Sequence, residues 1–241
     1  MPGLEENIKD FAKKAGAALV GVAGPDRMDG PASLDPGFIM PGTKSIVSIA
    51  LPLDVNAIYD FFGKISPVPH NVDQGIKNQR AHRICTEIAD YIVSQGYKAK
   101  VVPPNNTYRR SIDPFMVRPT FSHRFGGLVA GLGSFGLSGN LVTKEYGACI
   151  VLGTVVTNAK LKSDPVQPAR FVMDNRCKTC KLCDKSCTWA CSGMMTRNTC
   201  SSTVNCTPAA SGITSIFATP PASVCIPFPG IRNGPTGAST G

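Results

Sequence analysis

Apolar residues along the first two thirds of the chain recur at spacings that predict alternating helices and strands. Residues 4–15 have the spacing of an amphipathic helix, and Gly16 follows where such a helix ends. A second helix is predicted over residues 74–95, with Gly96 at its end. Its apolar stripe consists of Ile84, Cys85, Ile88, Ala89 and Ile92. Because Cys85 lies on that stripe, we expect it in the core.

Four segments have the composition of β-strands. Residues 45–51 are continuously apolar or β-branched, as in an interior strand of a sheet. Residues 97–102 alternate apolar side chains with lysines, which suits a strand with one wetter face. Residues 17–23 and 148–156 also have strand character. Combined with the two helices, these strands predict an α/β core.

Residues 105–145 lack such periodicity and are rich in polar, basic and glycine residues, so we expect them to line a site rather than fill a core. Within them, residues 131–136 match the dinucleotide fingerprint G-x-G-x-x-G. That fingerprint requires a preceding strand, a following helix and an acidic residue about 20 positions later. Residues 138–140 (Ser-Gly-Asn) would break a helix, and no carboxylate stands at the required distance. We therefore interpret the glycines as letting the backbone approach a flat ligand.

Four cysteines after position 176 form the motif C-x₂-C-x₂-C-x₃-C. Bacterial ferredoxins hold iron–sulfur clusters with this spacing, and the fourth thiolate ligates the neighbouring cluster in two-cluster proteins. The predicted metal ligands are Cys177, Cys180, Cys183 and Cys187. A zinc site more often has two cysteine pairs separated by a longer loop. Thr188 replaces the proline that normally follows the fourth cysteine, which weakens the prediction of a second cluster more than that of the first.

The composition limits the other possibilities. Of ten cysteines in 241 residues, only Cys85 and Cys149 precede the motif, so cysteine is not a disulfide framework here. The first residues lack a basic region followed by an apolar run, so we expect no signal peptide. No apolar stretch reaches the length of a membrane helix, so we expect no membrane segment. Together these features predict a cytoplasmic location. The net charge of +9 leaves RNA contact open, although basic residues beside the cysteines also offset the negative charge of a cluster.

The composition changes again after about Thr196. Ser, Thr, Pro and Gly make up more than half of the remaining residues, and Asp and Glu are absent. Disorder is one interpretation, and a shifted or truncated reading frame is the one we favour. A proline-containing linker over residues 163–168 leads to the cysteines. We therefore expect an α/β cofactor and substrate domain at 1–165, a ferredoxin-type [4Fe–4S] segment at 170–195, and a low-complexity tail at 196–241.

Several segments together resemble the epoxyqueuosine reductase and reductive dehalogenase family over roughly residues 4–187. The resemblance is carried by residues 39–47, 130–140, 143–147 and 154–161, followed by the four cysteines. It implies a nitroreductase-like sandwich core, a cobalamin over the glycine-rich loop, and a C-terminal module with two [4Fe–4S] clusters, which is incomplete here. In that family the clusters pass electrons to cobalt, and low-valent cobalt performs the reduction.

The resemblance also implies site residues. The predicted cofactor-binding residues are Gly131, Gly133, Gly136, Ser138 and Asn140. Asp113 is a candidate proton donor, because residues 111–114 stand near the family's Asp-Ser-Gly-Pro motif, although they lack its Ser-Gly and lie further upstream. His123 is a second candidate acid or cofactor contact, and a hydrogen-bonded structural histidine is the equal alternative.

These features predict an iron–sulfur oxidoreductase in which [4Fe–4S] passes electrons to a cobalamin-type site near residues 122–146. Two points stay open. The organic cofactor is cobalamin, flavin or none, and the substrate is a small molecule or a tRNA. A redox partner protein is expected as the electron donor. The alternative is a ferredoxin-like electron carrier or accessory subunit without its own substrate.

Overall fold

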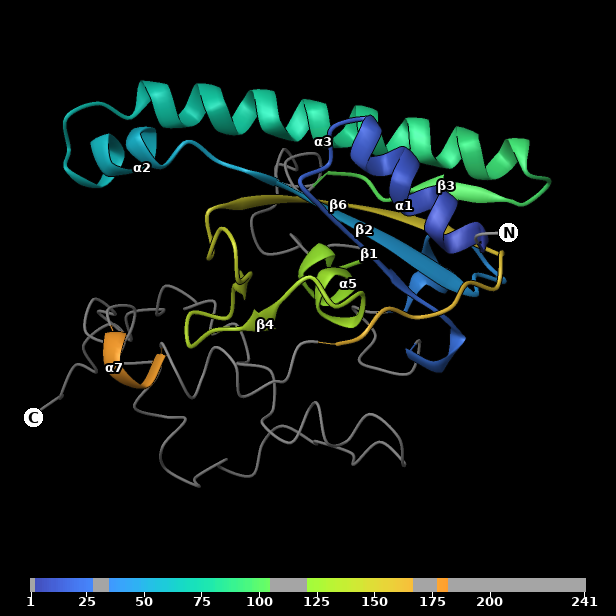
Figure 1. Ribbon diagram of the computed structural model, residues 1–241. Helices are drawn as coiled ribbons and strands as arrows, with labels where there is room; N and C mark the ends of the chain where they lie inside the picture. Colours follow the sequence, from blue (N-terminus) through green and yellow to red (C-terminus); the bar gives the residue numbers. More distant parts are fainter. Residues whose placement is uncertain (1–2, 28–34, 105–120, 167–176, 182–241) are drawn as a thin grey trace, which may run out of the picture.

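The computed structural model describes residues 3–27, 35–104, 121–166 and 177–181 (Figure 1). Its centre is an antiparallel sheet with strand order β1-β2-β6-β3. These strands are β1 (Leu19–Ala23), β2 (Ser45–Pro52), β3 (Ala99–Val101) and β6 (Ile150–Thr157). All four predicted strands are present, and β2 is interior as its continuous apolar composition predicts. The α/β prediction is therefore confirmed at this level.

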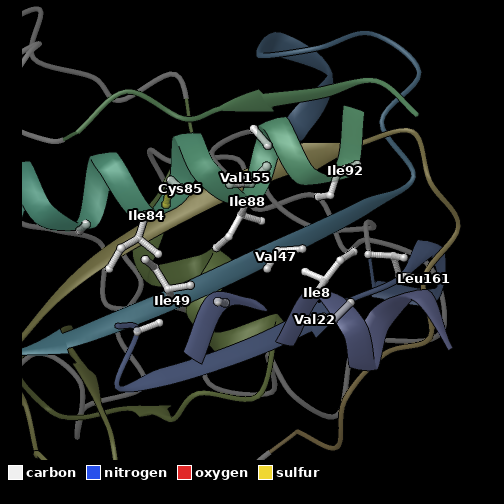
Figure 2. Packing of buried hydrophobic residues seen from close by; sticks show 14 of the residues in the cluster. Ile8, Val22, Val47, Ile49, Ile84, Cys85, Ile88, Ile92, Val155 and Leu161 are labelled. Atoms are coloured by element: carbon white, nitrogen blue, oxygen red, sulfur yellow. The ribbon is translucent and has the colours of Figure 1, made fainter. Parts of the chain in front are cut away.

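Two helices cover one face of the sheet, α1 (Leu4–Lys14) and α3 (Val68–Ser94). Figure 2 shows how their apolar stripes meet alternate residues of the strands, with Ile8 near Val22 and Ile88 near Val155. Gly16 ends the first helical segment at φ +104°, a backbone conformation that favours glycine. The second helix begins earlier than predicted, with a proline in its first turn, where the missing N–H costs nothing.

Cys85 of α3 lies in this core, as predicted. Its thiol is buried beside Gly153 of β6, where an added Cβ would lie 2.6 Å from Cys85 Sγ. The helix can pack this closely on the strand only because residue 153 has no side chain. Burial raises the pKa of the Cys85 thiol to about 12, so it stays protonated.

The opposite face of the sheet is covered by α5 (His123–Val129) and by a small hairpin of β4 (Ser134–Phe135) and β5 (Leu141–Val142). The helix and the hairpin lie in the aperiodic residues 105–145, which we expected to line a site. Residues 121–134 instead fill a core, so the expectation was wrong for these residues. The buried residues include Phe121, Leu128, Val129, Ala130, Leu132 and Leu141. Glycines at 126 and 127 hid the helical period because they replace apolar side chains where the helix touches the sheet.

After β6 the chain runs along the free edge of β1. Asp164 N donates to Val22 O at 2.9 Å, and Val22 N donates to Asp164 Oδ2 at 2.9 Å. Gly24 N donates to Ser163 Oγ at 2.8 Å. We call residues 161–166 the edge segment. The first two residues of the predicted linker 163–168, Ser163 and Asp164, are thus bonded to the domain, and residues 167–168 lie outside the described residues.

The first half of α3 and the helix α2 (Val55–Phe62) extend beyond the sheet as a helical hairpin (Figure 1). Its outer surfaces expose Tyr59, Phe62, Val68, Val72 and Ile76. Short helical turns η1 (Pro25–Arg27), η3 (Pro36–Phe38) and α7 (Lys178–Cys180) complete the described elements. Across these described parts, no helix is long and apolar enough to cross a membrane. The ferredoxin-type segment and the tail from 196 stay predictions, since only residues 177–181 of them are described.

Candidate functional site

The glycine-rich loop connects α5 to the β4–β5 hairpin. A helix therefore precedes the G-x-G-x-x-G residues, β4 lies within them and β5 follows, whereas a dinucleotide site has a strand before these glycines and a helix after them. The turn is closed by Gly136 N, which donates to Asn140 O at 3.0 Å, and by Gly139 N, which donates to Gly136 O at 2.9 Å. The structural context that a nicotinamide dinucleotide site requires is absent here, as the sequence predicted.

Two of the three fingerprint glycines are packed against the protein's own backbone. A Cβ on Gly131, whose φ is +79°, would overlap the carbonyl oxygen of Pro165 in the edge segment. A Cβ on Gly133 would overlap the carbonyl of Val142 in β5, lying 2.9 Å from its carbon. The fold itself thus requires glycine at both positions, whether or not a ligand comes near.

The predicted cofactor-binding residues differ in what they present to solvent. Gly133 and Gly136 are buried and Gly131 is half-buried, whereas Ser138 and Asn140 are exposed at the tip of the hairpin. Ser138 Oγ accepts from Asn140 N at 3.4 Å. Contact of these five residues with a cofactor stays a prediction, and the two exposed polar side chains are the ones free to approach a ligand from outside.

His123 is the first residue of α5 and is 3% exposed. Its Nδ1 lies 2.9 Å from Thr154 Oγ1 of β6, and its Nε2 lies 3.0 Å from the carbonyl oxygen of Pro103. The imidazole therefore joins three parts of the chain: the helix, the central strand and the segment after β3. This arrangement is that of the structural histidine we gave as the alternative, and the catalytic role of His123 stays a prediction.

The hydrogen-bond partners determine the tautomer of His123. A carbonyl oxygen can only accept, so Nε2 carries the proton and donates to Pro103 O. Nδ1 then accepts from the Thr154 hydroxyl. Burial lowers the pKa of His123, and the Pro103 bond opposes that shift without cancelling it. The ring is accordingly neutral at pH 7, with both nitrogens occupied.

Two polar residues beneath α5 were missed by sequence reasoning. Ser48 of β2 and Thr154 of β6 are fully buried and are directly opposite each other in the sheet. Ser48 Oγ has no hydrogen-bond partner among the described atoms. A Cβ on Gly126 would lie 3.1 Å from Ser48 Oγ and 3.3 Å from Thr154 Oγ1, so the glycine leaves room over both hydroxyls. Their signal in the sequence was a polar residue in the middle of each of two largely apolar strands.

The edge segment connects this region to the cysteines. Asp164 Oδ1 accepts from Lys9 Nζ at 2.8 Å, and its main-chain oxygen accepts from Arg27. Arg27 Nη1 also donates to Val129 O at 2.9 Å, at the end of α5. The chain that leads toward Cys177 is thus fixed to β1, to α1 and to the helix before the glycine turn.

The first two predicted metal ligands lie on one helical turn. Cys177 immediately precedes α7 with helical backbone angles, and Cys180 ends that helix, so the pair has the i, i+3 spacing that places side chains on one face. Lys181 adopts a left-handed conformation at φ +48°, which turns the chain after Cys180. Both cysteines are free thiols, half-buried and exposed respectively.

The remaining predicted chemistry lies outside the described residues. Cys183, Cys187 and Asp113 are among them. In the portion of the chain that is described, no group of three or more His, Cys, Asp or Glu side chains is gathered as for a metal ion. The donor chemistry of Cys177 and Cys180 fits a thiolate-bound cluster as far as these two ligands go.

The chain was compared with known proteins. No protein-family model matches it. An epoxyqueuosine reductase from Synechocystis sp. is 38% identical over 58 residues, which are 24% of this chain and 18% of the relative. A solved epoxyqueuosine reductase with an epoxyqueuosine-modified tRNA-Tyr stem loop has a TM-score of 0.50 and 17% identity, covering 79% of this chain and 53% of that one. A catabolic reductive dehalogenase with 3-bromo-4-hydroxybenzoic acid has a TM-score of 0.48 and 20% identity, covering 70% and 22%.

These comparisons support the resemblance inferred from the sequence. The chain spans about half the length of the solved epoxyqueuosine reductase that it matches. At 17% identity that likeness shows a shared mixed α/β fold and nothing about activity. The dehalogenase likeness is too low to carry a structural argument.

Proposed function

We propose that this chain is an oxidoreductase of the epoxyqueuosine reductase and reductive dehalogenase type. Cys177, Cys180, Cys183 and Cys187 would hold a [4Fe–4S] cluster, and that cluster would supply electrons to a cobalamin-type cofactor near residues 122–146. A redox partner protein supplies the electrons, and the substrate is a small molecule or a tRNA. Support comes from the local 38% identity to a reductase and from the shared fold.

The observation that carries the proposal is the connection between the cysteines and the glycine turn. The edge segment is hydrogen-bonded to β1 through Asp164 and crosses Gly131 at Pro165, and the first cysteine follows eleven residues after Val166. An electron carrier that needs only a cluster has no use for such an attachment to a folded domain. An enzyme that delivers electrons to a second cofactor requires the two parts to be held together.

The residues of this chain have distinct tasks in that scheme. The cysteines hold the cluster, and Lys181 beside them offsets part of its negative charge. Ser138 and Asn140 offer hydrogen-bonding groups to an organic cofactor at the hairpin tip. A corrinoid, when bound, would supply the low-valent metal that performs the reduction. Because Gly131 and Gly133 face protein backbone, we assign them to the shape of the turn and derive no catalytic step from them.

One observation favours the second candidate, a ferredoxin-like electron carrier or accessory subunit. Among the described residues, His123 is the buried titratable group nearest the proposed cofactor region, and both of its ring nitrogens are engaged by protein partners. An enzyme that protonates a substrate needs an acid free to reach it. The carrier needs none.

The cluster is tested by reconstitution without oxygen. Protein incubated with iron and sulfide should gain broad visible absorption and acid-labile sulfide, with about four irons per cluster. Cys180→Ser should lose both together. Cys149→Ser is the matched control, because this half-buried cysteine lies outside the motif, and it should keep full iron content. Bound zinc without sulfide would contradict the assignment.

The organic cofactor separates the two candidates. Cluster-loaded protein is titrated with cobalamin, with flavin mononucleotide and with NADH. Saturable cobalamin binding that is weakened in Ser138→Ala and Asn140→Ala supports the enzyme. Flavin binding would replace the corrinoid by a nitroreductase-like flavin site. Failure of all three, with an intact cluster, would favour the electron carrier.

A further inference from the structure

A buried hydroxyl group beneath α5 lacks a hydrogen-bond partner. Ser48 of β2 is fully buried, and its Oγ has no partner among the described atoms. Thr154 of β6 lies directly opposite in the sheet and is also fully buried. A Cβ added to Gly126 would lie 3.1 Å from Ser48 Oγ and 3.3 Å from Thr154 Oγ1, so both side chains are on the face that α5 covers. An unpaired buried hydroxyl is unfavourable, which indicates that Ser48 has a partner in some state of the protein.

Ser48 can reach Thr154 by turning about its own Cα–Cβ bond. Directly opposite residues of antiparallel strands have Cβ atoms about 4.5–5.5 Å apart. A staggered rotamer that points Ser48 Oγ toward the neighbouring strand therefore brings it within hydrogen-bonding distance of Thr154 Oγ1. Thr154 Oγ1 is in turn 2.9 Å from His123 Nδ1. We call Ser48, Thr154 and His123 the hydroxyl chain.

The hydroxyl chain can run in two directions, because a hydroxyl group both donates and accepts. With a neutral ring, the Ser48 hydroxyl donates to Thr154 Oγ1, and the Thr154 hydroxyl donates to His123 Nδ1. With a protonated ring, Nδ1–H donates to Thr154 Oγ1, and the Thr154 hydroxyl donates to Ser48 Oγ. The Nε2–H group donates to Pro103 O in both cases. The number of hydrogen bonds in the chain is therefore the same before and after protonation.

We propose that the hydroxyl chain makes His123 a buried proton-binding site. The ring takes up a proton from solvent at Nδ1, the Thr154 and Ser48 hydroxyls turn, and α5 stays attached to β6 and to Pro103. Ser48 makes this possible, since without it the turned Thr154 hydroxyl would be buried without an acceptor. The inference concerns the α/β core alone, and it holds whether the chain is an enzyme or an electron carrier.

No carboxylate lies on the described elements that surround the ring. The strands β1, β2, β4, β5 and β6 carry no charged residue, and residues 102–104 carry none. The charged residues on the other neighbouring elements are Arg124 of α5, which donates to Gly139 O, and Lys100 of β3, which is exposed. Both are cations, and burial of the ring also opposes a positive charge on it. The hydroxyl chain and the Pro103 carbonyl are thus the groups that favour the protonated ring.

The experiment follows the titration of His123 in the full chain by ¹⁵N NMR of the imidazole, from about pH 7.5 to about pH 4.5. Ser48→Ala removes the far end of the hydroxyl chain. Ser45→Ala is the matched control, because Ser45 is equally buried on β2 but its Oγ accepts from Leu161 N at 3.0 Å. Thr154→Ser keeps a hydroxyl in the middle of the chain and should titrate as the wild type does. The backbone amides of α5 report in the same samples whether the helix stays in place.

In the wild type we expect Nδ1 to gain the proton while the α5 amides keep their folded shifts. Ser48→Ala should lower the proton affinity of the ring about tenfold, because the protonated state then contains a buried hydroxyl without an acceptor. Ser45→Ala should leave the proton affinity unchanged. Equal proton affinities in Ser48→Ala and the wild type would overturn the proposal, as would a wild-type ring that stays neutral until the protein unfolds.

Urea unfolding over the same pH range gives a second decision if the Ser48 variant does not stay folded in acid. The stability of Ser48→Ala relative to the wild type should fall as the pH is lowered, because its folded state takes up the proton less readily than the wild type does. The stability of Ser45→Ala relative to the wild type should be the same at every pH. A loss in Ser48→Ala that does not change with pH would reduce Ser48 to a packing residue and contradict the proton site.

Discussion

His123 Nδ1 and Thr154 Oγ1 lie 2.9 Å apart, although 31 residues separate them in the chain. Together with the bond from Nε2 to Pro103 O, this contact ties the start of α5 to β6 and to the segment after β3. Because a carbonyl fixes the proton on Nε2, Nδ1 of the neutral ring accepts from the Thr154 hydroxyl, and protonation of Nδ1 would require that hydroxyl to turn and accept instead. The stability of this face of the sheet is therefore linked to the protonation of one histidine.

We expect the stability of the protein to fall as the pH is lowered from 7.5 to 5.5. The pKa of His123 is lower in the folded chain than its value of about 6.5 in the unfolded chain. The unfolded state thus binds the proton first, and the contribution of the neutral ring is complete above about pH 6.5 and is lost below it. One proton limits the slope to about 1.4 kcal/mol per pH unit. Urea unfolding at several pH values measures it.

His123→Gln should flatten this pH profile, and His82→Gln is the matched control because His82 is exposed on α3. Unchanged profiles in both variants would show that His123 carries none of the linkage. The ¹⁵N shifts of the wild-type imidazole provide a second test, since a protonated Nδ1 would contradict the tautomer derived from Pro103.

The sheet, and the helices α1 and α3 that cover one of its faces, could be predicted because their sequence periods are uninterrupted. The core stripe of α3 and the apolar run of β2 each satisfy one simple spacing. The opposite layer could not be predicted in this way. In α5 an added Cβ on Gly126 would meet Ser48 and Thr154 of the sheet, and one on Gly127 would meet Leu152, so close packing is achieved by removing side chains rather than by placing apolar ones.

The candidate site was only partly predictable for a related reason. From the motif G-x-G-x-x-G we predicted that a flat ligand approaches the backbone, and that stays a prediction; the structure shows other chain segments close to Gly131 and Gly133, which a sequence motif cannot distinguish from a ligand. Here the approaching groups are Pro165, 34 residues after Gly131, and Val142 in the other strand of the same hairpin as Gly133. The buried pair of Ser48 and Thr154 likewise becomes meaningful only when the strand register places them opposite each other.

Gly133→Ala should destabilise the fold before it affects any cofactor. Its Cβ would overlap the carbonyl of Val142, and backbone in a paired strand cannot yield as a flexible side chain does. Overpacking of this kind costs about 1–3 kcal/mol. Gly75→Ala is the control, because Gly75 lies in α3 with nothing within 4 Å of an added Cβ, and it should stabilise by roughly 0.5–1 kcal/mol. Thermal unfolding of both variants measures the difference, and equal melting temperatures would refute the packing account.

Asp164→Ala should release the edge segment from β1. The substitution leaves Val22 N without its carboxylate acceptor and leaves Lys9 Nζ with Glu6 alone, and an unsatisfied buried donor costs about 1–3 kcal/mol. Hydrogen exchange should accelerate at the Val22 amide while amides in β2 stay protected. Asp10→Ala, on the exposed side of α1, is the control and should leave exchange unchanged. Protection of Val22 in the Asp164 variant would show that the segment is held by other contacts.

The cysteines should separate into two classes by their reactivity toward iodoacetamide. Alkylation requires the thiolate, and burial of Cys85 between α3 and the sheet both raises the pKa of its thiol to about 12 and excludes the reagent. Cys180 is exposed and Cys177 half-buried, so in protein freed of iron both should be labelled within the folded state while Cys85 is not. Reconstitution with iron and sulfide should then protect Cys177 and Cys180 together, because thiolates that ligate a cluster are no longer free nucleophiles. Mass spectrometry of peptides gives the labelling at each site, with urea-unfolded protein as the control in which Cys85 reacts too. Labelling of Cys85 in the folded protein would mean that α3 opens readily from the sheet, and continued labelling of Cys180 after reconstitution would remove it from the cluster.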